Sequence, residues 1–142
     1  MSMTTTRDHR AASAVPHPDR AGAFLGSLAA QDFAQLGGAL SPGARMRALL
    51  PSGLHERAGA EVIAKQFVRW FGDTQDFELV EATVGEVGDR LHLSWRLRLR
   101  AERLGTGWFT VEQQAYADTG DDGRISRMDL LCTGYRPEGD DG

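Results

Sequence analysis

The stretch GAEVIAKQFVRWFGDTQDFELVEATVGEVGDRLHLSWRLRL, residues 59–99, decides the fold because its hydrophobic period changes along it from that of a helix to that of a strand. Near its start Ile63, Phe67 and Trp70 recur at helical spacing. Over residues 91–99 leucine or tryptophan alternates with polar residues, which predicts one long strand with a buried face and a solvated face. The sequence therefore predicts a helix that leads directly into a sheet.

The residues before this stretch indicate shorter elements. Asp19 can cap a helix whose apolar residues recur from residue 24 to residue 36, and Ser41-Pro42-Gly43 ends it. Residues 45–50 are typical of a short strand, and residues 51–59 of a loop. The first helical stretch is broken, since Gly37-Gly38 weakens its continuity, so that with the helix ending at Gly72 the sequence predicts three helical pieces in the N-terminal half of the chain.

The residues that follow the first long strands continue the sheet. Glycine-rich turns separate segments of high strand propensity, and long strands joined by tight turns form an antiparallel meander. We therefore expect an α+β fold in which the three helical pieces cover one face of a curved antiparallel sheet, an order typical of a cone with one deep pocket. The predicted strands are 77–87, 91–99, 108–117 and 124–135, with turns at 88–89, 105–107 and 119–123.

Composition excludes several classes of protein. The net charge of −4 leaves no basic surface that favours nucleic acid, and no apolar run is long enough to span a membrane. The single cysteine, Cys132, cannot form an internal disulfide, which fits a reducing, cytoplasmic compartment. We expect a disordered leader over residues 1–18, one domain over residues 19–137 and a short acidic tail over residues 138–142.

Four short motifs of the chain are Leu50-Pro51 with Gly59, Trp70-Phe71-Gly72, Val111–Tyr116 and Asp122–Ile125. Together they resemble the nuclear transport factor 2-like superfamily, and within it the SnoaL-like group of polyketide cyclases and ketosteroid isomerase-related proteins. The resemblance covers residues 19–137 and implies a cone-shaped fold, a pocket between helices and sheet, and a homodimer formed through the convex sheet face.

When the catalytic positions of ketosteroid isomerases are transferred to this sequence one by one, the resemblance implies that their chemistry is absent here. The position of the catalytic base falls on Leu50 and that of the phenol on Phe24, and neither side chain can move a proton. The third position falls on Glu112, which keeps a carboxyl group. The last-strand aspartate of the related epoxide hydrolases falls on Leu130, so that Asp129 would point to the opposite face of the strand.

Glu112 is the candidate acid or base, because a carboxyl group in an apolar cone has a raised pKa that suits proton transfer. Gln114 would then orient the substrate. The alternative is that Phe109, Val111 and Ala115 form the buried side of the same strand, which would leave Glu112 in water.

The remaining candidates are apolar or aromatic side chains that could line the pocket, and each could equally be ordinary core. We expect no metal site, because neither histidine of the domain has a second ligand at metal-binding spacing, and we expect no cofactor. The predicted substrate-binding residues besides Gln114 are Phe24, Leu50, His55, Trp70, Trp95, Met128, Leu130 and Cys132.

Two functional hypotheses follow. The first is a cofactor-independent enzyme, resembling SnoaL-like cyclases, isomerases or epoxide hydrolases, that acts on an apolar, polyketide- or terpenoid-like substrate with Glu112 shuttling the proton. The second is a non-catalytic protein that binds an apolar small molecule, which Leu50 and Phe24 favour. No nucleic-acid or membrane partner is expected in either case.

Overall fold

The computed structural model describes residues 18–138. The predicted leader lies outside the described residues except for Pro18, which begins the first helix, and the predicted tail does so except for Glu138. The elements in chain order are α1 (Pro18–Ala29), α2 (Phe33–Gly38), β1 (Leu40–Leu50), β2 (Gly53–Ala58), α3 (Ala60–Phe71), β3 (Asp76–Val87), β4 (Arg90–Arg100), the short 3-10 helix η3 (Glu102–Leu104), β5 (Phe109–Thr119), β6 (Ile125–Cys132) and β7 (Arg136–Pro137).

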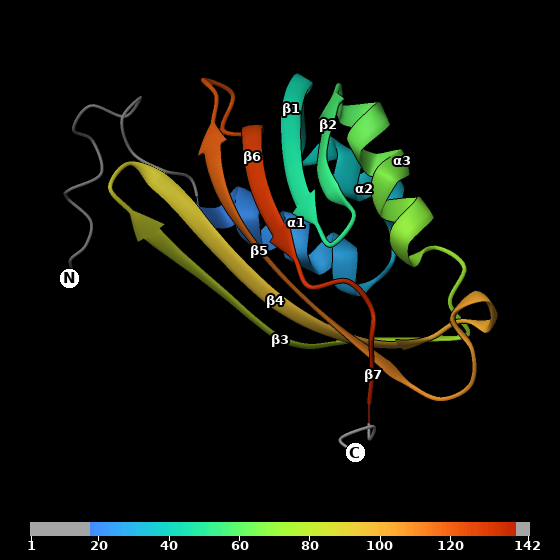
Figure 1. Ribbon diagram of the computed structural model, residues 1–142. Coiled ribbons are helices and arrows are strands. Elements are labelled where there is room, and N and C mark those ends of the chain that lie inside the picture. The colour runs from blue at the N-terminus through green and yellow to red at the C-terminus, as the bar shows by residue number, and fades with distance from the viewer. Residues whose placement is uncertain (1–17, 139–142) are drawn as a thin grey trace.

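The strands form one curved sheet in the order β2-β1-β6-β5-β4-β3, with β7 paired to β5. Figure 1 shows that the three helices lie on the same side of this sheet. The predicted α+β class with three helices over a curved sheet is confirmed. The sheet is mixed rather than wholly antiparallel, because β1 runs parallel to β6 with Met46 opposite Met128.

The N-terminal half differs from the sequence-based expectation at three points. The helical segment breaks at Gln31, whose φ of 56° is left-handed, and Asp32 then caps α2 by accepting a hydrogen bond from the backbone N–H of Gln35. β1 begins at residue 40 instead of 45, with a register shift that accommodates Pro42-Gly43. Residues 53–58 form the edge strand β2 where we expected a loop.

The core lies between the helices and the inner face of the sheet. Every second residue of β4, from Leu91 to Leu99, is buried, as the alternation predicts. Phe24 of α1 packs against Phe67 of α3 at 5.5 Å between ring centroids and against Trp95 of β4 at 5.8 Å. These aromatic contacts join the helices to the centre of the sheet.

The outer face of the sheet carries cross-strand ion pairs. Arg96 pairs with Glu81 at 2.6 Å, and Arg98 pairs with Glu78 at 3.1 Å. These arginines alternate with the buried leucines of β4, so they form the solvated side of that strand. Within residues 18–138, no helix is both long and apolar enough to cross a membrane.

Candidate functional site

A cavity of about 510 Å³ opens between the end of α3, the β1–β2 turn and the inner face of β5 and β6. We call it the cone pocket. Its walls are mostly apolar or aromatic, and none of its lining side chains carries a formal charge. It is lined by Leu50, Pro51, Ser52, Trp70, Phe71, Val111, Gln113, Cys132, Thr133, Gly134 and Tyr135.

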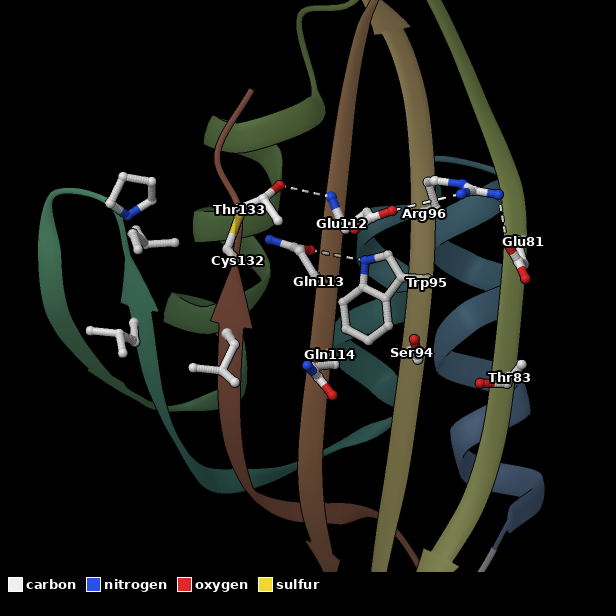
Figure 2. A pocket seen from close by; sticks show the side chains of 14 residues that line it. Glu81, Thr83, Ser94, Trp95, Arg96, Glu112, Gln113, Gln114, Cys132 and Thr133 are labelled. Atoms are coloured by element: carbon white, nitrogen blue, oxygen red, sulfur yellow. Dashed lines mark hydrogen bonds and ion pairs between the residues drawn. The ribbon is translucent and has the colours of Figure 1, made fainter. Parts of the chain in front are cut away.

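Gln113 is the buried polar group of this pocket. Its side chain is 2% exposed, and its Oε1 accepts a hydrogen bond of 2.9 Å from the indole Nε1 of Trp95. Because an indole N–H can only donate, this bond fixes which end of the amide is oxygen. Figure 2 shows the amide nitrogen turned away from Trp95, toward Cys132 on the neighbouring strand. This Nε2 is buried, and its one interaction among residues 18–138 is a weak one with the Cys132 sulfur.

The two titratable side chains of the cone pocket are held in their neutral forms. Burial raises the pKa of the Cys132 thiol, although hydrogen bonding from the Gly134 N–H and the nearby Gln113 amide favours the thiolate. Burial also raises the pKa of Tyr135, against the opposing effect of Arg103. The Tyr135 hydroxyl donates to the backbone oxygen of Trp70 at 2.6 Å and closes one side of the pocket.

A second hollow, of about 500 Å³, lies on the outer face of the sheet, and we call it the outer groove (Figure 2). Polar side chains from three strands line much of it, among them Glu81, Ser94 and Arg96. It meets the cone pocket at the end of β1, where both hollows are lined by Leu50, Pro51, Gln113, Cys132 and Thr133.

The structure places Glu112 in this outer groove and not in the cone pocket. Its side chain is 53% exposed, and its carboxylate lies 3.6 Å from Arg96. Gln114 lies on the same outer face, where its Oε1 is 2.9 Å from Nε2 of His92. The reason is strand alternation: Val111 and Gln113 point inward, so their neighbours point outward. The structure therefore shows the alternative orientation, in which Phe109, Val111 and Ala115 form the buried side of β5 and Glu112 is exposed to water.

The structure divides the predicted substrate-binding residues into three groups. Leu50, Trp70 and Cys132 line the cone pocket. Trp95 lines the outer groove and donates its indole N–H to Gln113, whereas His55 lies on β2, outside the lining of both hollows, and its Nε2 is 2.9 Å from the Ser52 hydroxyl. Fully buried in the core, and outside the pocket lining, are Phe24, Met128 and Leu130.

The sequence-based reasoning missed Gln113, Val111 and Tyr135 as pocket residues. The alternation of Phe109, Val111 and Ala115 was the signal that would have placed Gln113 on the inner face. Tyr135 was expected within the last strand, but β6 ends at Cys132, and Gly134, with φ of 80°, turns the chain toward α3. No local pattern indicates that turn.

Comparison with solved structures shows which fold this is. A predicted polyketide cyclase from Xanthomonas campestris is 16% identical, with a TM-score of 0.64 over 81% of this chain and 88% of that one. An LEH-like epoxide hydrolase from M. tuberculosis is 20% identical, with a TM-score of 0.61 over 85% of this chain and 83% of that one. A protein with a ketosteroid isomerase-like fold from Catenulispora acidiphila, solved with trimethylamine, is 14% identical, with a TM-score of 0.65 over 80% and 84%.

The chain has the nuclear transport factor 2-like fold. No protein-family profile matches the sequence, and no curated protein is significantly similar to it. At these identities, the likeness to the solved structures shows the architecture alone, and the chemistry has to be argued from the residues present.

Proposed function

We propose that this nuclear transport factor 2-like protein binds an uncharged, largely apolar small molecule in the cone pocket without transforming it through Glu112. The observation that carries the proposal is the lining: a cavity of about 510 Å³ with aromatic and aliphatic walls and no formally charged side chain. A pocket lined in this way stabilises a bound apolar ligand because apolar surface of both the ligand and the pocket is removed from water. It offers no ion-pair partner to a charged ligand group. Glu112 on the outer face contributes nothing to it.

A fluorescent binding assay tests this proposal. N-Phenylnaphthylamine is uncharged, and its emission rises in an apolar environment, so it is expected to bind the wild-type protein. Val111→Trp should weaken that binding by about tenfold or more, because the indole would fill space that the ligand needs. Val87→Trp is the matched control, since Val87 is an exposed residue of β3 outside both hollows.

Glu112→Gln belongs in the same assay. It removes an exposed carboxylate and should leave both the affinity and the thermal stability essentially unchanged. Undiminished binding by Val111→Trp, or a loss of binding in Glu112→Gln comparable to that of Val111→Trp, would move the ligand out of the cone pocket and contradict the proposal.

The second candidate function is a cofactor-independent cyclase, isomerase or epoxide-opening hydrolase acting on a polyketide- or terpenoid-like substrate. Structures of the same fold described as a polyketide cyclase and an epoxide hydrolase favour it. Its acid would have to be the neutral phenol of Tyr135 or thiol of Cys132, and its main contribution would be to hold the substrate in a reactive shape. This enzymatic function can be tested by incubating the protein with styrene oxide and monitoring the reaction by NMR. Formation of the diol from the epoxide and water would favour it.

We also propose that two copies associate through the outer face. Leu49 and Leu131 lie opposite each other on β1 and β6, with exposures of 48% and 44%, and both line the outer groove. Adjacent exposed leucines beside alternating arginines and glutamates suit a self-complementary contact. Sedimentation equilibrium should give a dimer for the wild type and a monomer for Leu131→Asp. A wild-type monomer at high concentration would rule out this interface.

A further inference from the structure

A third hollow, of about 430 Å³, lies where β1 runs between β2 and β6 (Figure 1), and we call it the arginine pocket. Four of its seven lining residues are arginines and one is a glutamate, so the lining has a net formal charge of +3 in a protein whose net charge is −4. None of these residues lines the cone pocket or the outer groove. The arginine pocket is lined by Arg45, Met46, Arg47, Glu56, Arg57, Ala58 and Arg127.

The register of the strands places like charges opposite each other in this pocket. Arg45 of β1 is the partner of Arg127 on the parallel strand β6, and both residues are exposed. Like charges directly opposite on neighbouring strands are destabilising. On β4, by contrast, the arginines at positions 96, 98 and 100 each lie opposite an acidic residue of β3, as Arg98 does opposite Glu78. The arginine pocket therefore keeps a surplus of positive charge that an anion would neutralise.

The neighbouring carboxylate of Asp129 does not remove this surplus. It accepts hydrogen bonds from Arg47 at 3.2 Å and from Arg90 at 3.0 Å, and Arg127 lies 3.9 Å away. One carboxylate is thus divided among three guanidinium groups. Arg45 forms no ion pair within residues 18–138. Its guanidinium is left to a ligand.

Arg57 is held in place at the pocket by two hydrogen bonds. Its Nε donates to Oε1 of Gln66 at 3.0 Å, and its Nη1 donates to the backbone oxygen of Glu56 at 2.8 Å. Gln66 belongs to α3 and is 8% exposed, so the first of these bonds anchors the guanidinium to a buried group. A guanidinium that is already ordered loses little conformational freedom when it binds an anion.

The charge and size of the arginine pocket select a small phosphate compound. Guanidinium groups donate pairs of hydrogen bonds whose geometry matches phosphate. A hollow of about 430 Å³ is in the range of sites for small organic molecules, so it has room for more than the phosphate itself. A long polyanion such as nucleic acid would also meet Glu56, Asp129 and the net negative charge of the protein.

We infer that the arginine pocket binds the phosphate group of a small phosphate monoester, with Arg45, Arg47 and Arg127 around the phosphate and Arg57 beside it. This inference goes beyond the proposed function and does not depend on it. The cone pocket is proposed to take an uncharged ligand, whereas the arginine pocket takes an anion from a different part of the molecule.

Isothermal titration calorimetry at low ionic strength tests the inference with ribose 5-phosphate, ribose and inorganic phosphate. Ribose 5-phosphate is expected to bind, inorganic phosphate to bind several-fold more weakly, and ribose not to bind. Absence of binding by ribose 5-phosphate, or equal binding by ribose, would overturn the inference. Inorganic phosphate binding as tightly as the ester would contradict the assignment to a monoester.

A pair of variants assigns the binding to this pocket. Arg45→Gln should weaken binding of ribose 5-phosphate about tenfold or more, because it removes a charged donor to the phosphate. Its thermal stability without ligand should not fall, since Arg45 is exposed and lies opposite Arg127. Arg69→Gln is the matched control: it removes the same charge from an exposed position on α3 outside all three hollows. Equal losses in the two variants would mean a general attraction of charge and contradict the site.

Side-chain NMR of the wild-type protein locates the anion without any variant. Ribose 5-phosphate should shift the Nε–H resonances of Arg45, Arg47 and Arg127 and leave that of Arg69 in place. Similar shifts at Arg69 and at the pocket arginines, or no shift at the pocket arginines, would overturn the inference. Either result would leave the proposal for the cone pocket unaffected.

Discussion

Replacing Trp95 by alanine is expected to lower the free energy of unfolding by about 4 kcal/mol. Trp95 is 2% exposed at the centre of β4 and packs against Phe24 of α1. Its loss would leave a cavity beneath the helices and would deprive Gln113 of the hydrogen bond to its Oε1. Urea denaturation followed by circular dichroism measures the change.

Trp108→Ala is the matched control. Trp108 is half-buried beside the first residue of β5, and its ring lies 4.2 Å from the guanidinium of Arg98 on the solvated side of the sheet. Replacing Trp108 by alanine is expected to lower the free energy of unfolding by about 1 kcal/mol, because it removes only a cation–π contact and a partly buried side chain. Equal losses for the two variants would mean that Trp95 does not join the helices to the sheet as described.

Replacing Asp129 by asparagine is expected to lower the free energy of unfolding by about 2 kcal/mol near neutral pH. Asp129 accepts hydrogen bonds from Arg90 at 3.0 Å and Arg47 at 3.2 Å, and Arg127 lies 3.9 Å away. Removing its charge leaves three arginines around an uncharged side chain. Asp121→Asn, in an exposed turn, is the control and should change little.

The same carboxylate gives a pH dependence. Partial burial alone would raise the pKa of Asp129, but hydrogen bonds from Arg90 and Arg47, together with the positive charges of Arg90 and Arg127, outweigh it and lower the pKa. Because the pKa is lower in the folded than in the unfolded state, the stabilisation is complete above about pH 4 and is lost as the pH falls through the folded value. Asp129→Asn should therefore lose less stability than the wild type between neutral and acid pH. Parallel curves for the two proteins would contradict this role.

The fold could be predicted because its signals are local. The alternation along β4 has one apolar face and one charged face, and the spacing of Ile63, Phe67 and Phe71 gives α3 its buried stripe. β2 could not be predicted, because it is an edge strand whose Leu54 is 57% exposed, so it lacks an apolar face. The parallel pairing of β1 with β6 has no local signal, since the two strands lie far apart in the sequence.

The site was harder to predict than the fold. Superfamily positions pointed to Glu112, whereas the alternation of β5 places Gln113 inside, and a one-residue difference on a strand exchanges the two faces. The polar side chain of Gln113 interrupts the apolar alternation of β5, so the sequence alone does not indicate that it is buried. Its hydrogen bond to Trp95 explains how the amide is accommodated in the interior. Leu50 and Trp70 were found because they are apolar and lie near the ends of predicted elements, and Cys132 was found because it alternates with Met128 and Leu130 on the predicted last strand.

A crystal structure of the protein with N-phenylnaphthylamine tests most directly the claim that the cone pocket is the ligand site. The account predicts the bound molecule in contact with Trp70 and Val111. N-Phenylnaphthylamine bound instead in the outer groove, beside Glu112 and Gln114, would contradict that claim.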